Sequence, residues 1–279
     1  MHLKHMQLAQ RVANLYAERP EVRAVALSGS LGGAHTDASS DIDLYVYTRA
    51  EIPLEVRKTI VERSGGASRA DVGLNFWGPG DEWFDAASGI EVDIIYFDAQ
   101  WMEDQVRRVM QEHQPSLGYS TCFAFTAHHS QIFFDPQDWL ADLQVLSRQP
   151  YPEALRENII RHNHPVLRKI IPSYFFQLEK AVQRGDLVSV NHRLAGLLAS
   201  YFDILFAFNR QLHPGEKRLV QKTVASCGQL PANMEAEITA VLAASAAPEL
   251  DFLAKLTALL DHLDQLLLAE GFKDLPDSA

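Results

Sequence analysis

The sequence is poor in cysteine, and no long stretch of it is uniformly apolar. Its two cysteines, Cys122 and Cys227, lie far apart and form no Cys-x-x-Cys pair, which leaves no disulfide framework and no cysteine-based zinc site. No window reaches the ~18 consecutive apolar residues of a membrane span, and the first ten residues lack the apolar core of a signal peptide. These absences predict a cytoplasmic protein that makes no membrane contact.

Positive charge is also scarce. The 279 residues include 25 Lys and Arg against 36 Asp and Glu, a formal net charge of −11. This is the wrong sign for a protein that grips a nucleic-acid backbone, so no polymeric DNA or RNA partner is expected. Hydrophobic residues make up 47% of the chain and charged residues 22%, a composition that excludes intrinsic disorder and favours a folded core.

The first half of the chain alternates between helical and strand patterns. Short apolar runs at 22–28, 41–47 and 89–98 predict strands, 70–76 predicts a weaker one, and 77–89 has the composition of a polar, turn-rich loop. Helical spacing of apolar residues predicts helices at 5–18, 54–63 and 99–113. We therefore expect an α/β (α+β) domain with a mixed sheet over residues 1–148.

The second half has long amphipathic patterns and no convincing strand. Pro165 and Pro172 are expected to kink or split the first of these patterns. The segments, separated by Gly, Pro or Asn, are 153–183, 186–212, 215–227, 233–246 and 249–270. They predict an all-α helical bundle over residues 149–279.

A glycine–serine turn and two carboxylates carry the clearest chemical signal. Gly29 and Ser30 end the first strand, and Asp41 and Asp43 open the second. Residues two apart on a strand point to the same face, so these carboxylates repel one another unless a cation lies between them. Mg²⁺, which binds carboxylates and substrate phosphates, suits such a pair, and a strand-to-helix turn with free amides suits a phosphate.

A third acid, Asp93, interrupts the apolar run 89–98, and Glu91 shares its face. An acid among valine and isoleucine needs a partner. Three carboxylates on adjacent strands, holding two metal ions and a triphosphate, meet the needs of in-line nucleotidyl transfer.

These motifs resemble the polymerase-β-like nucleotidyltransferases, whose pattern is an apolar strand, Gly-Ser, a spacer, Asp-x-Asp and a later strand acid. The domain order is similar to that of small bacterial aminoglycoside and lincosamide adenylyltransferases with a C-terminal helical domain. The resemblance implies that Asp41, Asp43 and Asp93 bind the metal, and Ser40 also matches the pattern. For Glu91 it implies the general base, although a solvent-exposed acid at a strand edge is an equally good interpretation.

The resemblance also implies nucleotide contacts. Gly29 and Ser30, with Ser40, would seat the phosphates, and Arg210 and Lys217 in the helical half match positions that lie near the triphosphate in such enzymes. The physical reason is independent of the family, because an acidic site that binds a tetra-anionic nucleotide needs cations beyond its metals.

The sequence therefore predicts an enzyme, a Mg²⁺-dependent nucleotidyltransferase that moves AMP from ATP to a hydroxyl of a small, antibiotic-like molecule and releases pyrophosphate. We expect a monomer or homodimer. Two alternatives remain open: nucleotidyl transfer to a protein or tRNA, as in toxin–antitoxin systems, and a catalytically silent nucleotide-binding regulatory module.

Other residues carry weaker signals. The eleven histidines show no His-Glu-x-x-His pattern, and solvated or capping roles are expected for them. Asp203, in an apolar helical stretch, is either a buried helix partner or a contact for a substrate amine. Trp77 and Trp83 either contact a ligand ring or pack in the core.

Overall fold

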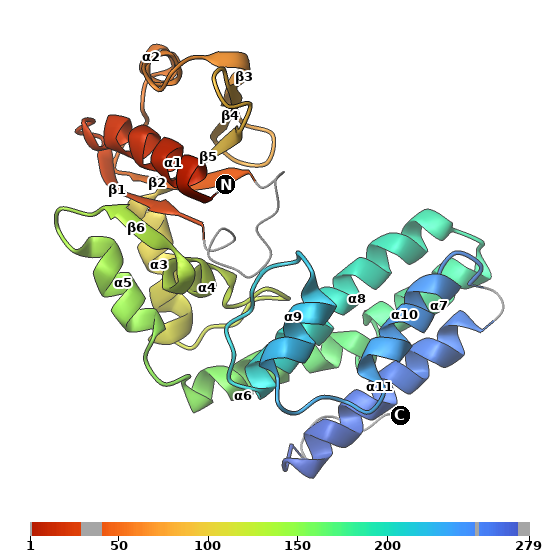
Figure 1. Ribbon diagram of the computed structural model, residues 1–279. Coiled ribbons are helices and arrows are strands. Elements are labelled where there is room, and N and C mark those ends of the chain that lie inside the picture. The colour runs from red at the N-terminus through yellow and green to blue at the C-terminus, as the bar shows by residue number, and fades with distance from the viewer. Residues whose placement is uncertain (1, 29–40, 249–250, 273–279) are drawn as a thin grey trace. The chain divides into compact units, whose positions relative to one another are not determined.

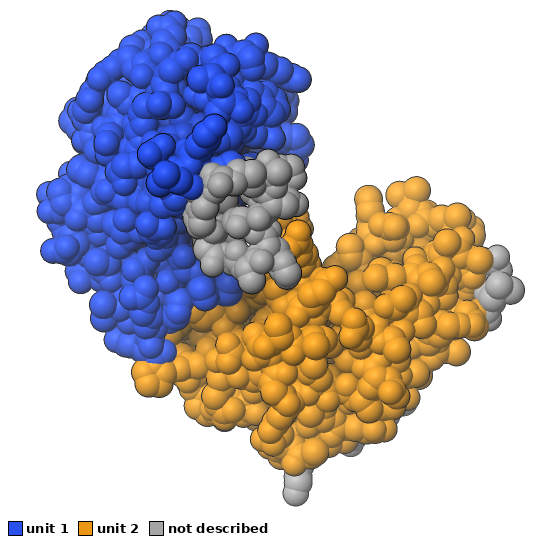
Figure 2. Space-filling view, viewed as in Figure 1, with its two compact units in different colours: residues 1–108, 123–149 blue, residues 109–122, 150–279 orange. Residues whose placement is uncertain are grey.

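The computed structural model describes residues 2–28, 41–248 and 251–272. The chain divides into two compact units, coloured separately in Figure 2. Unit 1 contains residues 1–108 and 123–149, and unit 2 contains residues 109–122 and 150–279. Each unit has its own hydrophobic core. The predicted fold class, a mixed sheet domain followed by a helical region, is confirmed.

Unit 1 is built on a six-stranded mixed sheet (Figure 1). Its strand order is β3-β4-β5-β2-β1-β6, in which β2 and β5 are parallel and every other neighbouring pair is antiparallel. The strands are β1 (Val22–Leu27), β2 (Ile42–Thr48), β3 (Ala67–Leu74), β4 (Gly80–Asp85), β5 (Glu91–Asp98) and β6 (Gln131–Phe134).

Helices cover both faces of this sheet. On one face α1 (His2–Ala17) and α2 (Leu54–Arg63) pack on alternate residues of the central strands, including Leu44 and Ile94, which are fully buried. On the other face lie α3 (Ala99–Met110), α4 (Cys122–His129) and α5 (Trp139–Ser147), which contact aromatic residues of β2 and β5. Residues two apart on β2 therefore face the same helical layer, and the residue between them faces the other layer.

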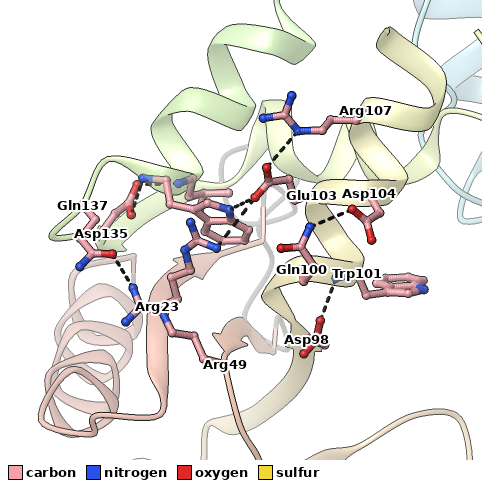
Figure 3. A network of polar contacts seen from close by, with 12 residues as sticks. Arg23, Arg49, Asp98, Gln100, Trp101, Glu103, Asp104, Arg107, Asp135 and Gln137 are labelled. Atoms are coloured by element: carbon pink, nitrogen blue, oxygen red, sulfur yellow. Dashed lines mark hydrogen bonds and ion pairs between the residues drawn. The ribbon is translucent and has the colours of Figure 1, made fainter. Parts of the chain in front are cut away.

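A polar network fixes α3 and α5 to one another (Figure 3). Glu103 on α3 accepts hydrogen bonds from the indole of Trp139 and from Arg107, both at 2.9 Å. Asp135 accepts the backbone amides of residues 139, 140 and 141 and so caps the first turn of α5. These contacts hold the helices rigidly over the aromatic face of the sheet.

The predicted loop 77–89 contains a strand, β4, and that expectation was wrong. Its side chains alternate between buried and exposed, but two of the three buried ones, Asp81 and Asp85, are acids, which disguised the strand period. Asp81 is fully buried because Arg57 donates to it from α2 and Tyr96 donates from β5 at 2.6 Å. The third, Trp83, is 1% exposed and belongs to the core.

Unit 2 consists of helices. Helix α8 packs against α6 and α7, and α10 packs against α11. Pro165 lies inside α6 without breaking it, and the break falls before α7, where Pro172 stands. The helices are α6 (Glu153–Arg168), α7 (Tyr174–Gln183), α8 (Leu187–Phe208), α9 (Leu219–Ser226), α10 (Met234–Ala244) and α11 (Phe252–Ala269). In the described part of the chain, no helix is long and apolar enough to cross a membrane.

The predicted boundary between residues 148 and 149 lies one residue from the division at Gln149, but segment 109–122 differs. It precedes that boundary in sequence and yet clusters with unit 2. Gly118 donates its amide to the Asn163 side chain at 2.9 Å, and Ser120 donates to Asp203 on α8. Contacts between residues far apart in sequence place segment 109–122 in unit 2. No change in local composition marks this assignment.

Candidate functional site

Three acids form a row across neighbouring strands of unit 1. Asp43 of β2 lies directly opposite Asp93 of the parallel strand β5, and Glu82 of β4 lies opposite Asp93 on its other side. Directly opposed residues point to the same face of a sheet, so the three carboxylates share one face. We call Asp43, Asp93 and Glu82 the acid row.

The acid row has an electrostatic signature. Burial, followed by the charges of Asp43 and Glu82 and then of Asp41 and Glu91, raises the pKa of Asp93 from 3.8 to about 6. Like charges on adjacent strands disfavour ionisation, because each carboxylate destabilises the charged form of its neighbour. Such an arrangement is costly for the fold by itself and typical of a site that receives a cation.

The end of β1 adjoins the acid row. The amide of Ser28 donates to the carbonyl of Asp43 at 2.9 Å, and the hydroxyl of Tyr45 donates to Oγ of Ser28 at 3.3 Å. Burial raises the pKa of Tyr45, and the charges of Asp43 and Asp93 add to the effect, so its phenol stays protonated and able to donate. Ser28, the residue that leads into the predicted phosphate-binding turn, is therefore held beside the carboxylates.

Oxygen donors of this kind suit a hard divalent cation. Asp43 and Asp93 are half-buried and adjacent, and Mg²⁺ is commonly held by one or two carboxylates together with substrate phosphates. Within the described residues, no three histidine, cysteine or acidic side chains converge closely enough to hold a metal ion by themselves. The residues present fit a Mg²⁺ ion that arrives with a phosphate ligand.

The structure brings some predicted residues together and leaves others outside its scope. Asp41 is half-buried just before β2, and its charge acts on Asp93. Gly29, Ser30 and Ser40 lie outside the described residues. Glu91 is exposed and lies opposite Phe84, one step along the face from the acid row.

Glu82 was missed by the sequence interpretation. It stands in the segment taken for a loop, and only its register against β5 reveals it. The one local signal was the alternation around it, in which Asp81 and Trp83 are buried while Glu82 and Phe84 are exposed. An exposed acid between two buried residues marks one face of a strand, although it does not tell which neighbour the strand will have.

The predicted cations belong to unit 2. Arg210, half-exposed, is paired with Glu153 at 2.9 Å. Lys217 is exposed, and desolvation together with the charges of Lys217 and Arg218 lowers the pKa of Lys222, so three cations gather around the start of α9. Gly215, with a φ of 82°, provides the left-handed backbone of the turn that precedes them.

Asp203 is a buried helix partner. It is 1% exposed and accepts the amide of Ser120 at 3.0 Å, the hydroxyl of Ser120 at 2.6 Å and the side-chain amide of Asn163 at 3.2 Å. These donors stabilise its charge within unit 2. We call Ser120, Asn163 and Asp203 the Asp203 network.

Two histidines contradict the expectation of solvated or capping roles. His164 is 1% exposed, and its Nε2 contacts Asp264 at 2.5 Å. His213 is fully buried, accepts the amide of Gly215 through Nδ1 at 3.1 Å, and has its pKa lowered by burial and by Lys222 from 6.5 to about 4. Both side chains pack inside unit 2, and for His213 burial favours the neutral imidazole.

Comparisons with known proteins give limited matches. A family model described as a domain of unknown function, DUF4037, matches residues 120–219, less than half of the chain. Among curated proteins no match is found. A nucleotidyltransferase-like protein from Exiguobacterium sibiricum 255-15 has a similar solved structure, with a TM-score of 0.44 and 13% sequence identity over 95% of this chain and 75% of that chain.

Proposed function

We propose that this protein is a Mg²⁺-dependent nucleotidyltransferase that moves the AMP of ATP to a hydroxyl of a small molecule. The observation that carries the proposal is the register of Asp43 against Asp93, flanked by Ser28 on one side and Glu82 on the other. Three adjacent strands and the residue that follows β1 thereby present three carboxylates and a hydroxyl in one line. Adjacent carboxylates favour the binding of a cation over any neutral ligand, and the raised pKa of Asp93 reflects the repulsion that a cation would relieve.

The reaction consists of one displacement at phosphorus. The acceptor hydroxyl oxygen bonds to the α-phosphorus, the bond from that phosphorus to the bridging oxygen breaks, and pyrophosphate leaves with the electron pair. Asp43 and Asp93 would hold the metal, which neutralises phosphate charge when bound. The hydroxyl proton passes to a carboxylate of the same face, for which Glu82 and Glu91 are the candidates.

The triphosphate needs further cations, and we propose that Lys217 binds it in preference to Arg210. Lys217 is exposed and has Arg218 and Lys222 beside it, whereas the charge of Arg210 is already matched by Glu153. The Arg210–Glu153 ion pair must be broken before the guanidinium binds a phosphate. Binding through Lys217 therefore costs less free energy. Gly29, Ser30 and Ser40 remain proposed phosphate contacts.

The proposal is tested by titrating ATP into the protein with and without Mg²⁺, followed calorimetrically. Wild type should bind ATP only with Mg²⁺, and Asp43→Asn should weaken that binding by about tenfold or more. Glu18→Gln is the matched control, because Glu18 is an exposed acid that lies outside the strands of the sheet and is paired with Arg63. A folded wild type that binds no nucleotide would contradict the proposal.

Turnover is measured next by pyrophosphate release in a screen of hydroxyl-bearing small molecules. Release with a small acceptor supports the complete proposal. Binding without release for any small molecule, but release with a protein or tRNA substrate, would replace the acceptor class. Nucleotide binding without release from any acceptor would favour a silent regulatory module.

A further inference from the structure

A cavity lies at the opposite end of β2 and β5 from the acid row. Its volume is about 510 Å³, within the range of small-molecule sites. Thr48 and Asp98, which end the two strands directly opposite one another, form part of its wall. Thr48 follows Asp43 by five residues, a separation of about 16 Å along a strand. A small ligand in this cavity therefore does not contact the acid row.

The strand connections explain why a cavity forms here. The chain leaves β2 toward α2, on the face that α1 covers, and leaves β5 toward α3, on the other face. Where two neighbouring parallel strands send their connections to opposite faces, a crevice opens outside their carboxyl ends, and α/β proteins bind ligands in such crevices. In unit 1 the pair β2–β5 provides this switch point, and the cavity lies at it.

The charges around the cavity are predominantly negative. Arg57 lines it, but its guanidinium is bound to the fully buried Asp81 and to the carbonyl of Gly80, so its charge is already matched. Glu51 and Asp98 also line it, and both are exposed. Asp98 accepts the amide of Trp101 through one carboxylate oxygen, and among the described residues neither Glu51 nor Asp98 has an ion-pair partner.

Much of the remaining wall is apolar, and Asn75 also lines the cavity. Ile52, Leu54 and Leu74 contribute side chains, and Pro79 closes the turn between β3 and β4. The same turn carries Phe76 and Trp77, which are 81% and 95% exposed. Two neighbouring aromatic rings in water beside a cavity are an unusual use of apolar surface, and such surface commonly marks a binding site.

We propose that this cavity binds a small organic cation, an amine carried on an apolar or aromatic body. The ammonium group would lie near Glu51 and Asp98, and the apolar body would lie against Leu54 and Leu74. Exposed Trp77 can add a cation–π or stacking contact. The site is separate from the acid row, so it would serve a ligand other than the nucleotide, and the inference does not depend on the proposed function.

Calorimetric titration with two aromatic probes of similar size and opposite charge tests the sign of the site. Phenethylamine should bind about fivefold or more tightly than hydrocinnamate. Tighter binding of hydrocinnamate would overturn the proposal, because it would mean that the N-terminus of α2, whose first residue Leu54 lines the cavity, outweighs the two carboxylates. Absence of binding by phenethylamine to the folded wild type would overturn it as well.

Three variants locate the binding. The double variant Glu51→Gln/Asp98→Asn should remove the preference for phenethylamine, while the asparagine can still accept the Trp101 amide. Ala50→Trp should fill the cavity, which Ala50 lines from an exposed loop, and abolish binding. Asp43→Asn should leave phenethylamine binding unchanged. Binding that survives Ala50→Trp, or that Asp43→Asn removes, would contradict the assignment to this cavity.

Discussion

The acid row of unit 1 and the Asp203 network of unit 2 surround an aspartate with opposite kinds of groups. Asp93 has carboxylates on both sides, and its pKa is raised. Asp203 is more deeply buried, but three groups donate hydrogen bonds to it: the backbone amide and the hydroxyl of Ser120 and the side-chain amide of Asn163. Burial alone therefore does not identify a functional acid. Asp93 has no donor among the described residues and lies between other acids, an arrangement that an external cation would stabilise. An acid with donors, such as Asp203, instead holds the fold together.

The largest expected difference between the two acids is in activity. Asp93→Asn should lower the rate of pyrophosphate release by about a thousandfold, because the metal loses a ligand. The same change should raise the free energy of unfolding of the metal-free protein by about 1 kcal/mol at about pH 7, allowing for the screening of a half-exposed group. Steady-state kinetics and urea denaturation in EDTA measure the two effects. A destabilised Asp93→Asn would show that Asp93 is a structural acid like Asp203.

Asp203→Asn should behave in the reverse manner. The amide nitrogen would face donors that the carboxylate now accepts, which should lower the free energy of unfolding by about 3 kcal/mol. Asp261→Asn is the control, because Asp261 is half-exposed and paired with Arg168, and should cost less than about 1 kcal/mol. Urea denaturation compares the two. Equal stabilities would contradict the structural role of Asp203.

The two units should also respond to pH in opposite directions. The raised pKa of Asp93 means that the native state binds the extra proton between pH 3.8 and about 6, so this group's stabilisation is present at low pH and is lost as pH rises. The lowered pKa of His213 means that the unfolded state binds the extra proton between about pH 4 and 6.5. Stabilisation from His213 is therefore lost as pH falls through that window, by about 3 kcal/mol.

Hydrogen–deuterium exchange resolved by peptide follows each unit separately across this range. Unit 2 should lose protection on acidification, and His213→Asn should flatten that dependence even if the variant is less stable throughout. In unit 1, Asp93→Asn should remove the opposite slope. A His213→Asn variant with an unchanged slope would show that another group causes the acid sensitivity.

The smallest expected effect distinguishes the roles of Glu82 and Glu91. Glu82→Gln should lower kcat by about a hundredfold if Glu82 takes the acceptor proton, and Glu91→Gln should change kcat by less than about fivefold. KM for ATP should stay nearly constant in both, because neither side chain is a proposed nucleotide ligand. The reverse ranking would assign proton transfer to Glu91, as the sequence predicted, and would show that direct register with Asp93 matters less than position along the face.

Much of the fold could be predicted because its signals are local. Helix α2 spans the predicted residues 54–63, and β1, β2 and β5 fall within a residue or two of their apolar runs. The errors have a common cause. Strand β4 was hidden because buried Asp81 stands where the period calls for an apolar residue. Donors from other segments, Arg57 and Tyr96, make an acid acceptable there. Segment 109–122 joined unit 2 through hydrogen bonds to α6 and α8, which leave no mark on its own composition.

The sequence by itself determined a sheet domain followed by helices, and it determined that Asp43 and Asp93 stand in strands, because alternation and apolar runs are read within a few residues. Only the tertiary structure decided which acids meet. Asp43 and Asp93 are fifty residues apart, and Glu82 joins them through a hairpin register that one residue of slippage would reverse. The same limit applies to Asp203, whose role depends on donors brought from two other segments. Pairing between distant segments depends on the packing of the whole core, and no local pattern encodes it.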